Sequence, residues 1–441
     1  MSSTWDELSG RHNASFIENQ ETLRAAVPSP ISDYTSVEDA LSKVRSKMRP
    51  RHVAESVPVD GAFHRVSSRQ VFAPHDVPKL SSSHMDGFAV ISKDTGNARP
   101  SRPLALELVG AAGPGARSNR TIKSGEAVQV ATGAMLPPGA DAVVPKEHAE
   151  VSGGKVFVKL AVEPGSFVYH AGGDFRKGEV VLAKGRRVRA QDIGLMIGLG
   201  FARMDVWTRP KVKVIATGSE LTRSIRPEAG KTRESHSHVF MSLISSLGCV
   251  PLDGGVIGDD PRTLAKALRS AVATSDFVVT LGGTSAGGKD LIVDAVAGLR
   301  PDVLIHGIKL DRGRVTGVAC VRGKPVLMLP GPIQAAMNAF LILGVPLAEE
   351  LSGWERQDME FVCKLGSDWE GRKRFSDFKK VVYVRLRKGD ETTADPLLGE
   401  TESIRILTDA DAYLVVPEGV TRLTAGTPVK VRLVPGFSDN L

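Results

Sequence analysis

The sequence predicts an α/β fold combined with β-rich domains. Between about residues 211 and 351, short apolar runs alternate with stretches of helical periodicity. This alternation is typical of βαβ units and a mostly parallel sheet. From about 61 to 209, short apolar runs alternate with glycine- and proline-rich turns, and short β-like runs return after about 354. We therefore expect β-rich domains on both sides of the α/β region.

The composition fits a globular chain of several domains. The 441 residues correspond to about three domains of roughly 150 residues each. A hydrophobic content of 41% with 24% charged residues argues against wholesale disorder. The three cysteines (Cys249, Cys320 and Cys363) match neither a disulfide scaffold nor a metal-binding spacing, so we expect a reducing, cytoplasmic location. No signal peptide or membrane-length apolar stretch is evident, so we expect no membrane association.

The charge balance is basic but dispersed. Lys and Arg number 57 against 50 Asp and Glu, which gives a net charge of +7. Such a balance attracts phosphorylated ligands or nucleic acid only where the charge is clustered. The densest clusters are 372–374 and 379–380, and aromatic residues make up only 5% of the chain. We interpret these clusters as a solvated basic face and predict no nucleic-acid partner.

The elements follow from local pattern, in chain order. Residues 1–32 lack periodicity and are interpreted as a disordered tail. The segment 36–48 predicts a short helix with Ser36 as its N-cap. The predicted strands are 104–109, 127–130, 142–144, 155–160, 178–182, 184–188, 212–216, 250–255, 276–281, 303–306, 325–329, 381–386, 412–416 and 429–433. The predicted helices in the α/β region are 239–247, 262–273, 291–297 and 333–343.

Glycine-rich and acidic segments follow four of the α/β strands. They are 217–220, 258–260, 282–290 and 329–332. In an open parallel sheet the carboxyl ends of the strands form the ligand-binding edge. Small residues there allow backbone amides to approach phosphate oxygens. Glu220, Asp259 and Asp290 could then hold Mg²⁺ as hard oxygen ligands.

Each of these segments also has a simpler explanation. Asp259 and Asp260 precede Pro261, a pattern that more often caps a helix, and Glu220 suits the first turn of a helix. The glycines of 282–288 are harder to explain without a ligand. That loop nearly matches a phosphate-binding P-loop, but Asp290 replaces the required Ser or Thr, which disfavours an NTPase.

The β-rich half contains turn-like motifs. Asp86-Gly87 is first interpreted as a hairpin turn, and Thr132-Gly133 and 137–141 as two further turns. In the α/β region, His236 and His238 could suggest a metal site, but no third ligand is evident. We interpret these histidines as polar, exposed groups.

Taken together, the motifs resemble the molybdopterin molybdenumtransferase family, which includes the gephyrin E domain. The resemblance extends from about Val37 to the C-terminus. It is carried by the segments 83–89 (SHMDGFA), 131–137 (ATGAMLP), 216–221 (ATGSEL), 282–287 (GGTSAG) and 329–331 (LPG).

The resemblance implies a homodimer with four domains in each subunit. These would be a discontinuous linker domain, an inserted β-domain, a doubly wound α/β molybdopterin-binding domain and a C-terminal β-barrel-like domain. The corresponding ranges are 33–72 with 168–206, then 73–167, 207–352 and 353–441.

It also implies an activity: insertion of molybdate into adenylated molybdopterin, with Mg²⁺-assisted release of AMP. Asp86, Thr132 and Glu220 would be catalytic, and Glu220, Asp259 and Asp290 would hold the metal. Asp86 and Thr132 would act from the partner subunit. The residues implied to bind the pterin nucleotide are Thr217, Gly218, Gly282, Gly283, Ser285, Gly287, Arg314, Pro330 and Gly331.

The chain departs from the family pattern where molybdate would bind. Asp311 stands where relatives carry a basic residue, and Ala335 where they carry a serine. A carboxylate at an oxyanion site reverses the local charge, which Arg312 or Arg314 could offset. Further departures are 169–174, Pro332-Ile333 and Gly288. The alternative is a non-catalytic paralogue that carries molybdopterin to a molybdenum-enzyme client, or a scaffold.

Overall fold

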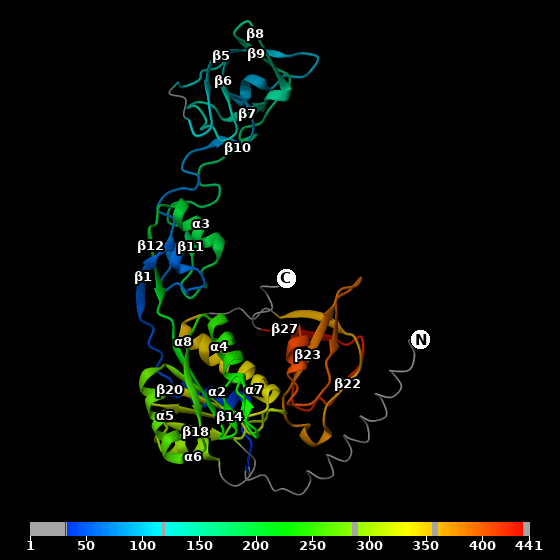
Figure 1. The fold of residues 1–441 in the computed structure, drawn as a ribbon. Coiled ribbons are helices and arrows are strands. Elements are labelled where there is room, and N and C mark those ends of the chain that lie inside the picture. Colours follow the sequence, from blue (N-terminus) through cyan, green and yellow to red (C-terminus); the bar gives the residue numbers. More distant parts are fainter. Residues whose placement is uncertain (1–30, 32, 117–119, 285–289, 355–359, 435–441) are drawn as a thin grey trace. The chain divides into compact units, whose positions relative to one another are not determined.

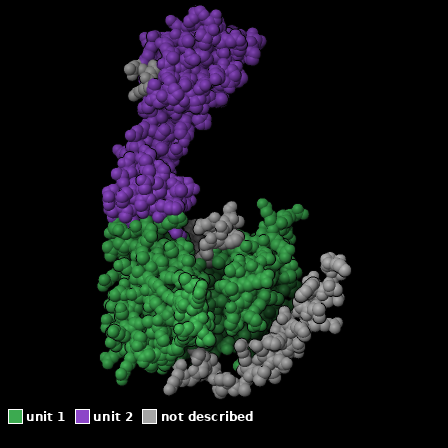
Figure 2. Space-filling view, in the orientation of Figure 1, with its two compact units in different colours: residues 1–55, 64–66, 207–441 green, residues 56–63, 67–206 purple. Residues whose placement is uncertain are grey.

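The computed structural model describes residues 31, 33–116, 120–284, 290–354 and 360–434. The chain forms two compact units, which Figure 2 colours separately. Unit 1 comprises residues 1–55, 64–66 and 207–441, and unit 2 comprises 56–63 and 67–206. The tail predicted for residues 1–32 lies almost wholly outside the described residues.

A six-stranded sheet forms the centre of unit 1 (Figure 1). The first four strands in the order given below run parallel, and the fifth is antiparallel to both of its neighbours. The expected mostly parallel α/β sheet is therefore confirmed. In sheet order the strands are β16 (Val250–Ile257), β13 (Lys211–Thr217), β17 (Phe277–Leu281), β20 (Lys324–Leu329), β19 (Gly317–Val321) and β18 (Val303–His306).

Helices cover both faces of this sheet, because its strands are apolar on both sides. In β13, Val212 and Val214 pack into one core and Ile215 into the other. This alternation follows from the two-residue period of a strand. The first core contains α2 (Val37–Lys47), α4 (His236–Ser246), α7 (Ile333–Ala339) and α8 (Val345–Ser352); the second contains α5 (Pro261–Thr274) and α6 (Leu291–Ala297).

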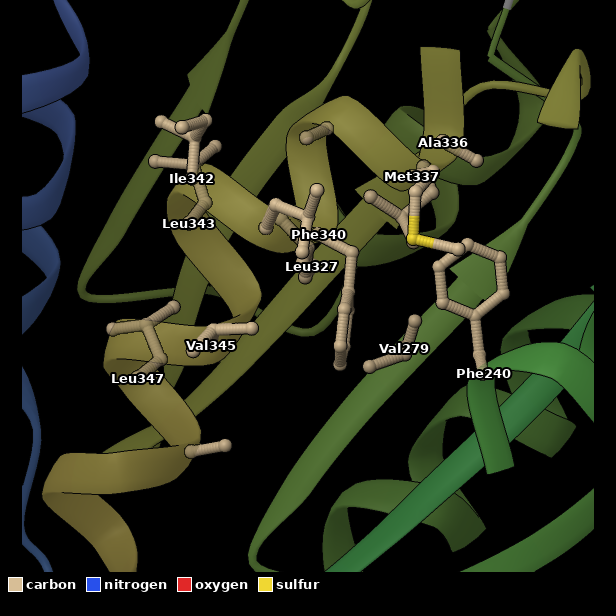
Figure 3. Close-up of a cluster of buried hydrophobic side chains, with 14 of the residues drawn as sticks. Phe240, Val279, Leu327, Ala336, Met337, Phe340, Ile342, Leu343, Val345 and Leu347 are labelled. Carbon is tan, nitrogen blue, oxygen red and sulfur yellow. The ribbon is translucent and has the colours of Figure 1, made fainter. Parts of the chain in front are cut away.

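The first core is densely aromatic and aliphatic (Figure 3). Phe240 and Phe340 meet edge to face with ring centroids 5.2 Å apart. A π-helical segment, Phe340–Gly344, joins α7 to α8, so the helical run continues past the predicted end at 343. The run Ile333–Ser352 has the length and apolarity of a membrane span, which the sequence did not suggest, but 83% of its 18-residue apolar window is buried inside the protein. Its apolar character is thus accounted for by the core.

Helix α2 begins where its sequence predicts. The Ser36 hydroxyl accepts a hydrogen bond from the amide of Asp39 at 3.1 Å, which is an N-cap. Val37, Ala40 and Val44 are buried against unit 1. Residues 33–55 therefore group with the α/β domain, although the resemblance places them in a linker domain.

The C-terminal part of unit 1 closes into a barrel, as expected. Val381 and Tyr383 of its third strand face the α/β core, and Val382 and Val384 face the barrel interior. The Tyr383 hydroxyl donates to Asn338 Oδ1 at 2.9 Å, which fixes the barrel on α7. In barrel order the strands are β21 (Phe361–Leu365), β24 (Thr393–Pro396), β23 (Lys380–Arg387), β25 (Ala412–Val416) and β27 (Pro428–Leu433). Nearby lie β22 (Trp369–Glu370), β26 (Arg422–Leu423) and α9 (Ile404–Asp409).

Unit 2 is built around a second six-stranded sheet, of mixed direction. The predicted strands of this region are present except 184–188, which is not a strand. In sheet order the strands are β7 (Ala142–Pro145), β4 (Gly87–Val90), β6 (Glu126–Val130), β5 (Leu104–Ala112), β9 (Lys155–Val158) and β8 (Ala149–Ser152). The remaining elements are β1 (Ala54–Pro58), β2 (Val71–Phe72), β3 (Ser82–Ser83), β10 (Val168–Tyr169), β11 (Val180–Leu182), α3 (Ala190–Gly198) and β12 (Arg203–Trp207).

The hairpin predicted at Asp86-Gly87 is wrong. Strand β3 pairs with β10, while β4 pairs with β6 and β7, so no hairpin joins β3 to β4. Gly87 is needed for close packing instead, since a Cβ at this position would lie 2.1 Å from the Val144 carbonyl oxygen. The turns at Thr132-Gly133 and 137–141 are confirmed by backbone hydrogen bonds from Ala134 to Ala131 and from Ala140 to Pro137.

Candidate functional site

Three of the glycine-rich segments meet at the carboxyl edge of the sheet in unit 1. The Thr217 hydroxyl, at the end of β13, donates to the Leu281 carbonyl of β17 at 3.1 Å. The Gly282 amide donates to the Leu329 carbonyl of β20 at 3.0 Å. The strands thus bring the segments starting at 217, 282 and 329 to one place, as parallel order requires.

Close packing explains why two of these positions are glycine. Gly282 and Gly283 both have positive φ angles, and a Cβ at Gly282 would lie 2.6 Å from the Thr217 carbonyl oxygen. The backbone of the loop therefore lies directly against Thr217. Ser285 and Gly287 lie outside the described residues.

Two acidic residues after β16 have different roles. Asp260 Oδ2 accepts from the Thr263 amide at 2.8 Å and caps α5, as the Asp-Pro pattern predicts. Asp259 does not cap the helix. Its Oδ2 accepts from the Ser219 amide, and its own amide donates to Ser219 Oγ, both at 3.0 Å. Asp259 thus ties the segment after β13 to the segment after β16.

Glu220 is exposed and directly follows Ser219, whose two hydrogen bonds with Asp259 are called the clamp below. The first turn of a helix is the wrong assignment for it, because the chain continues into strand β14 (Leu221–Thr222), which pairs with β15 (Thr232–Arg233). Its carboxylate lies over Gly218, where a Cβ would be 2.5 Å from Oε1. Among the described residues it has no hydrogen-bond or ion-pair partner, so it is free to accept from a ligand.

Asp290 lies close to a histidine that the sequence did not single out. His306 is the last residue of β18, and its Nε2 lies 3.1 Å from Asp290 Oδ2. The signal was available, since His306 ends a strand at the same sheet edge. Across the described ranges, no three His, Cys, Asp or Glu side chains form a metal-binding group. Glu220, Asp259 and Asp290 are therefore not gathered into one cluster, and their joint metal role stays a prediction.

The loop after β20 contacts helix α4. His236, the first residue of α4, is half-buried and hydrogen-bonds to the backbone of Gly331. Burial lowers the pKa of His236, opposed by Glu234 and by that hydrogen bond. The expectation of an exposed group is therefore wrong for His236 and right for His238.

The segment that departs from the family pattern is held by internal contacts. The Arg312 guanidinium donates to Gln334 Oε1 at 2.6 Å and to the Gly399 carbonyl at 2.7 Å, and burial lowers its pKa. Asp311 is buried and forms an ion pair with Arg372. The Arg312 guanidinium is thus engaged by Gln334 and Gly399 of its own chain.

Arg314 differs, because its guanidinium carbon lies 5.1 Å from the centre of the Phe375 ring. Arg372 and Arg374 lie 4.8 and 5.6 Å from the same ring centre. The basic clusters are only partly solvated, since Arg372 is paired with Asp311, and Lys380 is buried and donates to the Phe378 carbonyl. Of the two arginines considered in the departing segment, Arg314 is therefore the one left for an anionic ligand.

In unit 2, Asp86 is held by three donors. The Thr132 amide and hydroxyl donate to Oδ1 at 2.8 and 2.9 Å, and Lys146 Nζ donates to Oδ2 at 3.1 Å. These contacts, led by the Thr132 amide, lower the pKa of Asp86 from 3.8 to about 2. Asp86 is therefore ionised near neutral pH, where it is suited to holding a charge and unsuited to proton transfer.

Comparison with known proteins gives matches along nearly the whole chain. Three family models match: the MoeA N-terminal region (domains I and II) over residues 35–200, a probable molybdopterin binding domain over 213–350, and the MoeA C-terminal region (domain IV) over 363–434. The molybdopterin molybdenumtransferase of Bacillus subtilis is 31% identical over 389 residues, 86% of this chain and 90% of that protein. The Nostoc enzyme of that name is 27% identical over 423 residues, 92% and 96% of the two chains. A crystal structure of a molybdopterin biosynthesis MoeA protein from Pyrococcus horikoshii is 30% identical, with a TM-score of 0.74 over 91% of this chain and 99% of that one.

Proposed function

The chain belongs to the MoeA family of molybdenum-cofactor biosynthesis proteins, and we propose that it is a molybdopterin molybdenumtransferase. It inserts molybdate into the dithiolene of adenylated molybdopterin, with Mg²⁺-assisted release of AMP. The observation that carries this proposal is the free Glu220 carboxylate beside loops joined at one sheet edge.

The loops at this sheet edge are proposed to bind the phosphates of adenylated molybdopterin. The segments after β13 and β17 are proposed to hold the phosphate oxygens at this sheet edge, and Arg314 to add a positive charge. The clamp between Ser219 and Asp259 fixes the segment that carries Glu220. Bound Mg²⁺ would neutralise charge on the phosphates and stabilise the leaving AMP. The buried carboxylate of Asp290, which accepts no hydrogen bond within the described residues, fits such a cation.

Glu220 provides the catalytic half. Its carboxylate accepts a hydrogen bond from the attacking water or contacts the cation, because no protein group competes for it. Asp86 and Thr132 are proposed to complete the reaction from the partner subunit of a homodimer. Because Asp86 stays ionised, its role is to position charge rather than to exchange protons.

The alternative function is a non-catalytic carrier that delivers molybdopterin to a molybdenum-enzyme client. The specific observation in its favour is that Asp311 and Arg312 are both committed to internal contacts. The predicted oxyanion site then has fewer free cations than relatives with lysines there.

The three free cysteines are buried thiols, which supports the proposed cytoplasmic location.

The deciding experiment measures AMP release from adenylated molybdopterin with Mg²⁺ and a titration of molybdate. We expect turnover that saturates with molybdate and falls at least a hundredfold in Glu220→Gln, with nucleotide affinity nearly unchanged. A variant of the helix cap, Asp260→Asn, is the control and should retain turnover. Tight pterin binding without molybdate-dependent AMP release in the parent protein would contradict the transferase and support the carrier.

A further inference from the structure

Asp290 and His306 lie together without the hydrogen bonds that buried polar groups ordinarily make. Their side chains are only 12% and 19% exposed, respectively, and His306 Nε2 lies 3.1 Å from Asp290 Oδ2. Despite this proximity the two groups are not aligned as a hydrogen bond, and within the described residues both carboxylate oxygens and Nε2 are buried without a hydrogen-bond partner. Buried carboxylates and imidazoles are rarely left in this state, so a further group is expected between them.

Helix capping does not explain Asp290. The residue occupies the N-cap position of α6, where aspartate usually accepts a hydrogen bond from the first turn. Here the side chain makes no capping hydrogen bond. The carboxylate is therefore held at the sheet edge with both oxygens free.

The separation of the two groups fits a shared cation. Two ligands in adjacent octahedral positions, each about 2.1 Å from a metal ion, lie about 3 Å apart. The 3.1 Å between His306 Nε2 and Asp290 Oδ2 matches this spacing. A neutral imidazole directs its lone pair at the metal and needs no alignment with the carboxylate.

Two hydroxyl groups on neighbouring segments are also buried without a hydrogen-bond partner among the described residues. Thr284 lies in the loop that leads to Asp290, and its Oγ1 is buried without a partner. Thr316 directly precedes Gly317, which pairs with His306 across β18 and β19, and its Oγ1 is likewise buried without a partner. Such hydroxyls are suited to hold the water molecules that complete a metal's coordination.

We propose that His306 is a nitrogen ligand, beside the Asp290 carboxylate, of the divalent cation used in the proposed reaction, and that the site prefers Mn²⁺ to Mg²⁺. The inference rests on the proposed function for its use of a cation. One imidazole among oxygen donors shifts the metal preference of a site from Mg²⁺ towards transition metals. Substrate phosphate oxygens and water fill the remaining positions.

The test measures Mn²⁺ binding to the metal-free full-length protein by calorimetry and by pulsed EPR. The wild type should show a ¹⁴N coupling on bound Mn²⁺ that changes when histidine is labelled with ¹⁵N. His306→Gln should lose this coupling and bind Mn²⁺ about tenfold more weakly, with Mg²⁺ affinity nearly unchanged. Asp290→Asn should weaken the binding of both Mn²⁺ and Mg²⁺. His238→Gln, an exposed histidine of α4, is the matched control and should change neither.

The outcomes separate this inference from the proposed function. Bound Mn²⁺ without ¹⁴N coupling in the wild type, or a coupling that survives in His306→Gln, overturns the ligand assignment. Equal weakening of Mn²⁺ and Mg²⁺ in His306→Gln overturns the metal preference. The first of these outcomes needs no variant, so a folding defect in His306→Gln leaves it decisive. Nitrogen-coupled Mn²⁺ without AMP release would instead sustain the site and contradict the transferase.

Discussion

Ser219 and Asp259, 40 positions apart in the sequence, exchange two hydrogen bonds. The Ser219 amide donates to Asp259 Oδ2 and the Asp259 amide donates to Ser219 Oγ, each at 3.0 Å. Because Glu220 follows Ser219 directly, this pair fixes the backbone that presents the free carboxylate. The relationship makes Asp259 a positioning residue.

Asp259→Ala should therefore lower kcat for AMP release by roughly tenfold or more, because the segment carrying Glu220 loses its anchor. Ser219→Ala removes only one of the two bonds and should have a smaller effect. The adjacent Asp260→Asn is the control: asparagine can still cap α5 through its side-chain oxygen, so the melting temperature and kcat should both stay nearly unchanged. Equal kcat in Asp259→Ala and the parent would contradict the positioning role.

The low pKa of Asp86 depends on Thr132. Thr132→Val removes the hydroxyl donor and keeps the amide, so the pKa of Asp86 should rise from about 2 towards its ordinary value of 3.8. A lowered carboxyl pKa stabilises the folded state above the unfolded pKa, and this contribution is lost as pH falls through about 2. In Thr132→Val this contribution should be smaller, and its loss should be complete at a higher pH.

Carboxyl-carbon NMR of protein with labelled aspartate, assigned with Asp86→Asn, measures this titration. Lys146→Gln should also raise the pKa, by removing the ion pair with Oδ2. An Asp86 titration unchanged in both variants would show that these contacts do not set its charge.

Gly87 should not tolerate any side chain. Gly87→Ala places a Cβ 2.1 Å from the Val144 carbonyl oxygen, so strands β4 and β7 must separate. We expect a loss of more than about 4 kcal/mol in the free energy of unfolding. Gly110→Ala, in strand β5 of the same sheet, meets nothing within 4 Å and should change it by less than about 1 kcal/mol. Chemical denaturation followed by circular dichroism compares the two.

The proposed homodimer predicts complementation between two inactive variants. Asp86→Asn and Glu220→Gln would each damage a different subunit's contribution to the same site. Random mixing of the two gives about half heterodimers, each with one intact site, so roughly a quarter of wild-type AMP release should return. Analytical ultracentrifugation verifies the dimer first. No recovery in a mixture shown to exchange subunits would contradict the shared site.

Much of the fold could be predicted from local pattern. The two-residue and helical periods located five of the six strands of the α/β sheet, because they reflect which face of each element is buried. Strand β19 was missed, although all five of its residues are buried. The hairpin at Asp86-Gly87 was misassigned because close packing and a turn can both select glycine.

The candidate site was only partly predictable. The motifs identified Thr217, Glu220 and Asp290 because each follows a strand, but not what each side chain would meet. Arg312 illustrates the limit: its charge suggested ligand binding, yet its guanidinium is held by Gln334 and Gly399. His306 was overlooked because its proximity to Asp290 depends on two strands far apart in the sequence.

The sequence by itself determined the family, the α/β and β-rich architecture, and the segments that reach the binding edge. These depend on residue order and on local periodicity, which the chain carries directly. Only the tertiary structure decided which polar groups are satisfied and which are free. The clamp between Ser219 and Asp259, the internal commitment of Arg312, and the unpartnered pair of Asp290 and His306 all depend on contacts between distant segments. Whether a buried charge has a partner is decided by packing, which no local pattern specifies.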